Sequence, residues 1–103
     1  MKPHTLHLGG HRIHVRLVKE IHDDQVNKEE VGLGRANTYS GLIRIATQPY
    51  KDFTPEGALQ VYLHEAVHCI DQIFCGETLT EAQVDGVSQG LLQLLQQRSK
   101  WLR

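Results

Sequence analysis

Apolar and polar side chains alternate along residues 4–18, with one interruption at Gly9-Gly10. A period of two is typical of a strand with one buried face, and a glycine pair tolerates the positive φ that a tight turn needs. The pattern therefore predicts a β-hairpin. Its histidines, His7, His11 and His14, are interpreted as solvated residues of the polar face, with a second metal patch as the alternative.

The middle of the chain contains a polar segment followed by a short apolar run. Residues 19–37 are polar with weak periodicity, which predicts a loop or a short irregular element. The run Leu42–Ala46 is apolar and β-branched, which favours a third strand. We expect this strand to pair with the hairpin in a small antiparallel sheet.

Two helices are predicted in the second half of the chain. Thr54 and Pro55 are a typical N-cap and first residue, and apolar residues then recur at helical spacing as far as Phe74. A second helix begins after Thr80, which forms a capping-box pattern with Gln83. Its two glycines, Gly86 and Gly90, are expected to let it lie close to the first helix.

This order of elements predicts one α+β domain over residues 1–103, in which both helices pack on one face of the antiparallel sheet. The length of 103 residues fits a single domain. A net charge of −1 gives no electrostatic footprint for nucleic acid, so no nucleic-acid partner is expected. No signal peptide follows Met1 and no apolar run is long enough to span a membrane, which favours a cytoplasmic protein.

The candidate chemistry lies in the first helix, where residues 61–71 read VYLHEAVHCID. His64 and His68 are separated by four positions, so they share a helix face and can bind one metal ion. Glu65 lies on the adjacent face, where it can reach a metal-bound water. The flanking residues are uncharged, and polar groups on such a helix are costly unless they have a function. Cys69 is interpreted as a small buried apolar residue.

A zinc site of this kind needs a third protein ligand, and no histidine follows His68. Glu81 is favoured because the second helix returns antiparallel to the first, although a charge at a helix N-terminus is also an ordinary feature. Asp85 and Cys75 are the alternative ligands. If Asp85 is not itself a ligand, its carboxylate can orient a metal-binding histidine by bonding to the second ring nitrogen. Asp71 is better placed as a supporting or capping acid.

Two segments together carry a resemblance to a known family. HEAVHCID followed by LTEAQVDGVSQGLLQLL resembles the gluzincin metallopeptidases, in which H-E-x-x-H is paired with a later E-x-x-x-D, here residues 81–85. The chain is more similar to the small phage-encoded proteins of the ImmA/IrrE-like and minigluzincin kind. The resemblance covers residues 41–95.

The resemblance implies a zincin-like fold and the hydrolysis of peptide bonds in a peptide or protein substrate. One zinc ion per chain would be held by His64, His68 and Glu81 and would acidify a bound water, with Glu65 as the general base. Extended substrate would pair with the strand Leu42–Ala46 as an edge strand. A phenol is a possible oxyanion donor, and three are available without a basis for choice: Tyr39, Tyr50 and Tyr62.

Two other classes of protein are compatible with the sequence. The first is a catalytically latent, zinc-stabilised binding module that captures a partner along the Leu42–Ala46 edge. Glu65 distinguishes the two, because a purely structural zinc site needs a fourth protein ligand and no general base. The second is a metal-free helical interaction protein that dimerises through the leucines between residues 91 and 95. The oligomeric state is left open.

Overall fold

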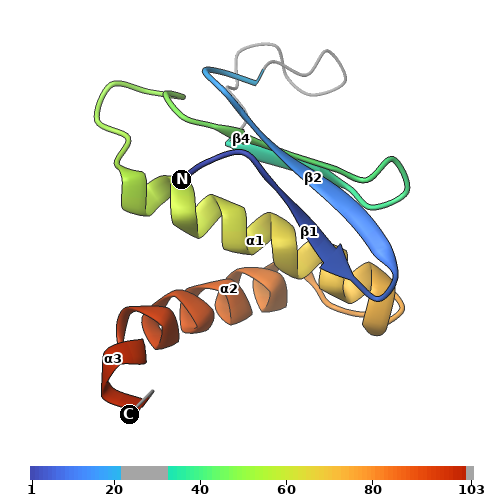
Figure 1. Ribbon diagram of the computed structural model, residues 1–103. Helices are drawn as coiled ribbons and strands as arrows, with labels where there is room; N and C mark the ends of the chain where they lie inside the picture. Colours follow the sequence, from blue (N-terminus) through green and yellow to red (C-terminus); the bar gives the residue numbers. More distant parts are fainter. Residues whose placement is uncertain (22–32, 102–103) are drawn as a thin grey trace.

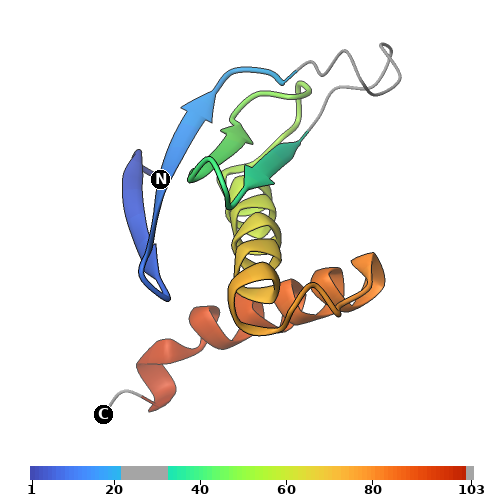
Figure 2. The same cartoon turned by 90° about the vertical axis from the view of Figure 1, so that its right-hand side faces the viewer.

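The structure is a computed structural model that describes residues 1–21 and 33–101. It confirms the α+β class, with a mixed sheet and helices gathered on one side of it (Figures 1 and 2). The elements in chain order are β1 (His4–Leu8), β2 (His11–Val18), β3 (Gly34–Asn37), β4 (Leu42–Ala46), α1 (Pro55–Phe74), α2 (Glu81–Gln96) and the short α3 (Arg98–Trp101).

The N-terminal hairpin forms as predicted. Strands β1 and β2 pair antiparallel, with Leu6 opposite Ile13. Gly9 and Gly10 make the turn with φ of 53° and 82°, which is the left-handed region that residues with a side chain rarely adopt.

The rest of the sheet differs from the prediction. The strand order is β1-β2-β4-β3, and β4 runs parallel to β2 rather than antiparallel. The antiparallel partner of β4 is β3, which was predicted to lie within a loop. Strand β3 has the sequence GRAN, and its four residues include no β-branched side chain, so its strand conformation depends on pairing with β4 rather than on local propensity. Of the 19–37 segment, residues 22–32 lie outside the described residues.

The core lies between the sheet and α1. Ile13 and Val15 of β2 and Ile43 and Ile45 of β4 are almost fully buried, and Cys69 of α1 packs into the same cluster with no exposed surface. Cys69 is therefore the small buried apolar residue that the sequence predicted. This packing directs one face of α1 into the core and leaves the face with His64 and His68 only partly covered.

Local capping fixes the start of each long helix. The Thr54 hydroxyl accepts a hydrogen bond from the Gly57 backbone N–H at 3.0 Å, at the start of α1. Thr80 and Gln83 form the complete capping box at the start of α2. Both starts agree with the sequence prediction, because a cap is decided by residues within one turn.

Helix α2 packs on α1, but not through its glycines. Nothing lies within 4 Å of a Cβ placed at Gly86 or Gly90, so the predicted close approach at these positions is wrong. The buried face of α2 instead presents Val84, Ser88 and Leu92, and Ser88 accepts a hydrogen bond from the Gln60 amide of α1 at 2.9 Å. In the described part of the chain, each helix is too short or too polar to cross a bilayer.

Candidate metal centre

The turn between α1 and α2 brings His64 and His68 of α1 next to Glu81, the first residue of α2. Asp71, buried near the end of α1, organises this turn: its carboxylate accepts hydrogen bonds from the backbone N–H groups of Thr78 at 3.0 Å and Leu79 at 3.3 Å. Asp71 is therefore a capping acid, one of the two roles expected of it. The returning chain then enters α2 at Glu81, beside α1.

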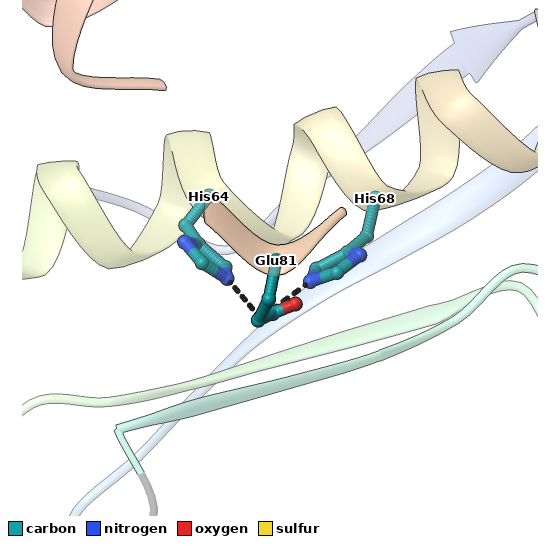
Figure 3. A group of neighbouring side chains, drawn as sticks. All are labelled: His64, His68 and Glu81. Atoms are coloured by element: carbon teal, nitrogen blue, oxygen red, sulfur yellow. Dashed lines mark hydrogen bonds and ion pairs between the residues drawn. The ribbon is translucent and has the colours of Figure 1, made fainter. Parts of the chain in front are cut away.

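Three side chains converge at this point, as Figure 3 shows. The Glu81 Oε1 atom lies 2.9 Å from His64 Nε2 and 3.1 Å from His68 Nε2. The three potential ligand atoms all lie within 4.8 Å of one another. The two histidines come from successive turns of α1 and the glutamate from the N-terminus of α2, so the cluster can hold a metal ion.

The donor set suits a tetrahedral metal ion, and the side chains need only small rotations to reach tetrahedral spacing. Ligand atoms about 2.0–2.2 Å from a zinc ion at tetrahedral angles are separated by roughly 3.3–3.5 Å. The two N···O separations of 2.9 and 3.1 Å are a few tenths of an ångström shorter than this. All three side chains are partly exposed, with Glu81 69% accessible, so small rotations can open the required space.

Asp85 lies behind one of the histidines. Its Oδ1 atom is 3.5 Å from His64 Nδ1, the ring nitrogen that does not face Glu81. Gln89 donates a hydrogen bond to the other carboxylate oxygen at 2.8 Å and holds the side chain in place. Asp85 thus lies where a carboxylate can orient a metal-binding imidazole through its second nitrogen.

The alternative metal ligands are placed differently. Cys75 is the exposed C-cap residue of α1 and does not belong to the cluster of three. Within residues 1–21 and 33–101, His7, His11 and His14 join no group of three potential ligands, so the second metal patch is not formed. His14 instead pairs with the Thr5 hydroxyl, at 3.1 Å.

Glu65 is half-buried beside the cluster and has an unusual electrostatic environment. Burial raises the pKa of its carboxyl above the ordinary value, and this outweighs the opposing attraction of His68, His64 and Arg35. A raised pKa makes a carboxylate a stronger base and brings its pKa closer to the value that suits a general base. Glu81 shifts the other way: burial acts to raise its pKa, but hydrogen bonds from the two histidines lower it overall.

The edge strand β3 passes close to Glu65. A Cβ atom at Gly34 would lie 3.0 Å from Glu65 Cγ and 2.6 Å from Val61 Cγ1, so only glycine fits this approach. The next residue, Arg35, turns its guanidinium back to donate to the Gly34 carbonyl at 2.7 Å. Sequence analysis did not identify Gly34 or Arg35 as part of the site, because GRAN is too short and too polar to predict a strand.

The substrate edge predicted from the sequence is also wrong. Leu42–Ala46 is β4, an interior strand paired with β2 on one side and β3 on the other, so it offers no free edge. Among the described strands, the edge strand beside α1 is β3. The Ala46 N–H donates to the Leu33 carbonyl at 2.9 Å. Along an antiparallel pair, residues that hydrogen-bond to the partner strand alternate with residues that do not. The backbone groups of Gly34 and Ala36 therefore point away from β4.

The three tyrosines occupy separate environments. The Tyr62 hydroxyl lies 3.0 Å from His4 Nε2, and this contact joins α1 to β1. Tyr50 makes an edge-on contact with Phe53, at a ring-centroid distance of 5.2 Å, and Tyr39 is 88% exposed. None of these contacts involves His64, His68 or Glu81, so the geometry favours no tyrosine as an oxyanion donor.

Comparisons with models of known protein families, with curated protein sequences and with solved structures found no match. The gluzincin resemblance of residues 41–95 therefore stays an expectation from the sequence motifs. What the structure adds is the convergence of His64, His68 and Glu81 from two helices.

Proposed function

We propose that this protein is a zinc-dependent metallopeptidase. The observation that supports the proposal most strongly is the meeting of His64 Nε2, His68 Nε2 and Glu81 Oε1 within 4.8 Å, next to the half-buried Glu65. Two imidazoles and one carboxylate leave the fourth tetrahedral position open, which is the arrangement of catalytic rather than structural zinc sites. Both cysteines are free, which is compatible with the proposed location in a reducing cytoplasm.

Each residue has a distinct role in this proposal. A zinc ion held by the three ligands would activate water and polarise the substrate carbonyl. Glu65 accepts the proton from the attacking water and later delivers it to the leaving amine. Asp85 orients the His64 ring through Nδ1.

The substrate is proposed to bind along β3. An extended peptide can add to this edge through the outward backbone groups of Gly34 and Ala36, with the Arg35 guanidinium moving away from the Gly34 carbonyl. Because β3 passes over Glu65 at Gly34, a peptide paired there would lie beside the general base. Side chains of the substrate would then alternate between α1 and solvent.

Zinc content per chain tests the ligand set. We expect about one zinc per chain in the wild type, as implied by a single three-ligand site, and loss of zinc in His68→Ala and Glu81→Ala. Two matched controls should keep their zinc: His7→Ala on the hairpin, and Glu56→Ala, which removes the first-turn glutamate of α1. A wild type that takes up no zinc from solution contradicts the proposal, and retention of zinc by Glu81→Ala contradicts the third ligand.

Turnover tests the catalytic role. Hydrolysis of an unfolded protein such as casein should fall by about 10²–10⁴-fold in Glu65→Gln, which is the range for a lost general base. The zinc content of this variant should stay that of the wild type, because Glu65 is not a ligand. The alternative, a latent binding module, predicts a zinc-loaded wild type that cleaves nothing and is unaffected by Glu65→Gln.

A further inference from the structure

The sheet face that points away from α1 is strongly basic. Ile13, Val15, Ile43 and Ile45 point into the core, so their neighbours in sequence point outward. The polar residues that these alternations place on the outer face are Thr5 and His7 of β1, Arg12, His14 and Arg16 of β2, Arg44 of β4, and Arg35 and Asn37 of β3. We call this surface the basic face. No helix covers it in either view of the molecule (Figures 1 and 2).

Three arginines form a row across the basic face. Arg44 is directly opposite Arg16 on one side and Arg35 on the other, in three neighbouring strands. Neighbouring strands are about 4.8 Å apart. Like charges at directly opposite positions destabilise a sheet. The directly opposed Arg16 and Arg44 therefore cost folding stability, and an anionic partner would offset that cost.

Within residues 1–21 and 33–101, the carboxylates lie outside the strands of the sheet. The strands of the basic face carry no aspartate or glutamate. In the part of the chain that the structure describes, no carboxylate pairs with Arg12, Arg16 or Arg44. Most acidic residues of these two ranges lie on the helices and their connection, for example Glu56, Asp71, Glu77, Glu81 and Asp85, while Glu20 follows β2 and Asp52 precedes α1. A net charge of −1 for the whole chain thus conceals a positive surface.

We propose that the basic face binds single-stranded nucleic acid through its backbone phosphates. The fixed cations on this face are all arginine, whose planar guanidinium matches phosphate geometry and also stacks on bases. The imidazoles of His7 and His14 add flat rings beside them. A flexible strand can follow an open, twisted sheet, whereas specific duplex recognition uses an element inserted into a groove, and the described residues of this face provide none.

Two shallow depressions mark the ends of the proposed path. One is lined by Arg35, Asn37, Ser40 and Arg44, and the other by His4, Thr5, His14 and Arg16. Each combines a guanidinium with neutral hydrogen-bond donors, which is the usual composition of a phosphate contact. Neither includes a metal ligand. Binding on this face is therefore independent of the metallopeptidase proposal and needs no zinc.

Fluorescence anisotropy of a labelled 20-residue oligothymidylate, titrated with metal-free wild-type protein, tests this proposal. We expect dissociation constants of about 10⁻⁶–10⁻⁴ M near physiological salt, and a salt dependence of about −0.7 per phosphate contact in a log–log plot. Arg16→Gln/Arg44→Gln should weaken binding by about tenfold and reduce the slope by about 1.4. The control, Arg98→Gln/Lys100→Gln in α3, removes the same charge away from the sheet and should bind as the wild type does.

The folded state of the variant is checked independently. Because Arg16→Gln/Arg44→Gln removes like-charge repulsion, its urea midpoint at low salt should equal or exceed that of the wild type, so weaker binding cannot be ascribed to unfolding. Absence of binding by the wild type at 50 mM salt overturns the proposal, as does an equal loss in the α3 control. Tighter binding to polyglutamate than to the oligonucleotide identifies an acidic protein as the partner instead, and tighter binding to duplex excludes the single strand.

Discussion

Gly34 is the residue on which the approach of the edge strand to the site depends. A methyl group at this position would lie 2.6 Å from Val61 Cγ1 and 3.0 Å from Glu65 Cγ. We predict that Gly34→Ala lowers the free energy of unfolding by about 1–3 kcal/mol, since overpacking displaces either the strand or the helix. Urea denaturation followed by circular dichroism measures this change.

The matched control is a glycine without neighbours. Gly86 lies inside α2, and a Cβ there meets nothing within 4 Å. Gly86→Ala should therefore raise stability by about 0.5–1 kcal/mol through helix propensity alone. If Gly34→Ala proves as well tolerated as Gly86→Ala, β3 does not approach Glu65 as closely as described.

At this scale the sequence predicted the residues of the site better than their surroundings. His64 and His68 were predicted to share a face because the i, i+4 relation is a property of any helix. Glu81 was favoured because the second helix was expected to return antiparallel to the first, and the structure places it against both rings. Gly34 could not be predicted, since its role exists only where β3 crosses α1.

Among the elements, α2 has the most direct link between local sequence and site geometry. Thr80 caps the helix immediately before Glu81, and its hydroxyl accepts the Gln83 N–H at 3.1 Å. We predict that Thr80→Ala lowers stability by about 0.5–2 kcal/mol and weakens zinc binding, because fraying of the first turn releases Glu81. Denaturation and a competitive zinc titration measure the two effects.

The cap of α1 provides a control that separates the effect on stability from the effect on zinc affinity. Thr54→Ala removes the equivalent hydrogen bond at the start of α1, far along the helix from His64 and His68. It should lower stability by a similar amount, about 0.5–2 kcal/mol, and leave zinc affinity unchanged in the folded protein. Equal zinc affinities for both variants would mean that the cap does not position Glu81.

The elements differ in how far their sequences determine them. Both long helices begin where the cap residues indicate, and the hairpin turns at its two glycines. These signals act within a few residues and need no tertiary context. Strand β3 has no such signal, and it is a strand because β4 supplies its hydrogen-bond partners.

For the whole molecule, metal binding is expected to appear as added stability. The proposed ligands come from two helices, so an unfolded chain does not hold them together and zinc binds the folded state preferentially. At free zinc 100 times the dissociation constant, the gain should be about 2.7 kcal/mol. Calorimetric melting with zinc, and again after chelation, measures it.

Two glutamate variants, each in the first turn of a long helix, serve as the control for zinc-dependent stability. Glu56→Ala should show the full zinc-dependent increase in melting temperature, whereas Glu81→Ala should show little of it. An equal increase in both would assign the stabilisation to a site that does not include Glu81.

The sequence by itself determined the hairpin, the strand Leu42–Ala46, both long helices and the pair of histidines on one helix face. Each of these follows from periodicity or capping over a few neighbouring residues. Only the tertiary structure decided that β2 and β4 run parallel, that β3 rather than β4 is the edge strand of the described sheet, and that four arginines share the sheet face away from α1. Strand order and the surfaces it creates depend on contacts between residues far apart in the chain, which local patterns do not encode.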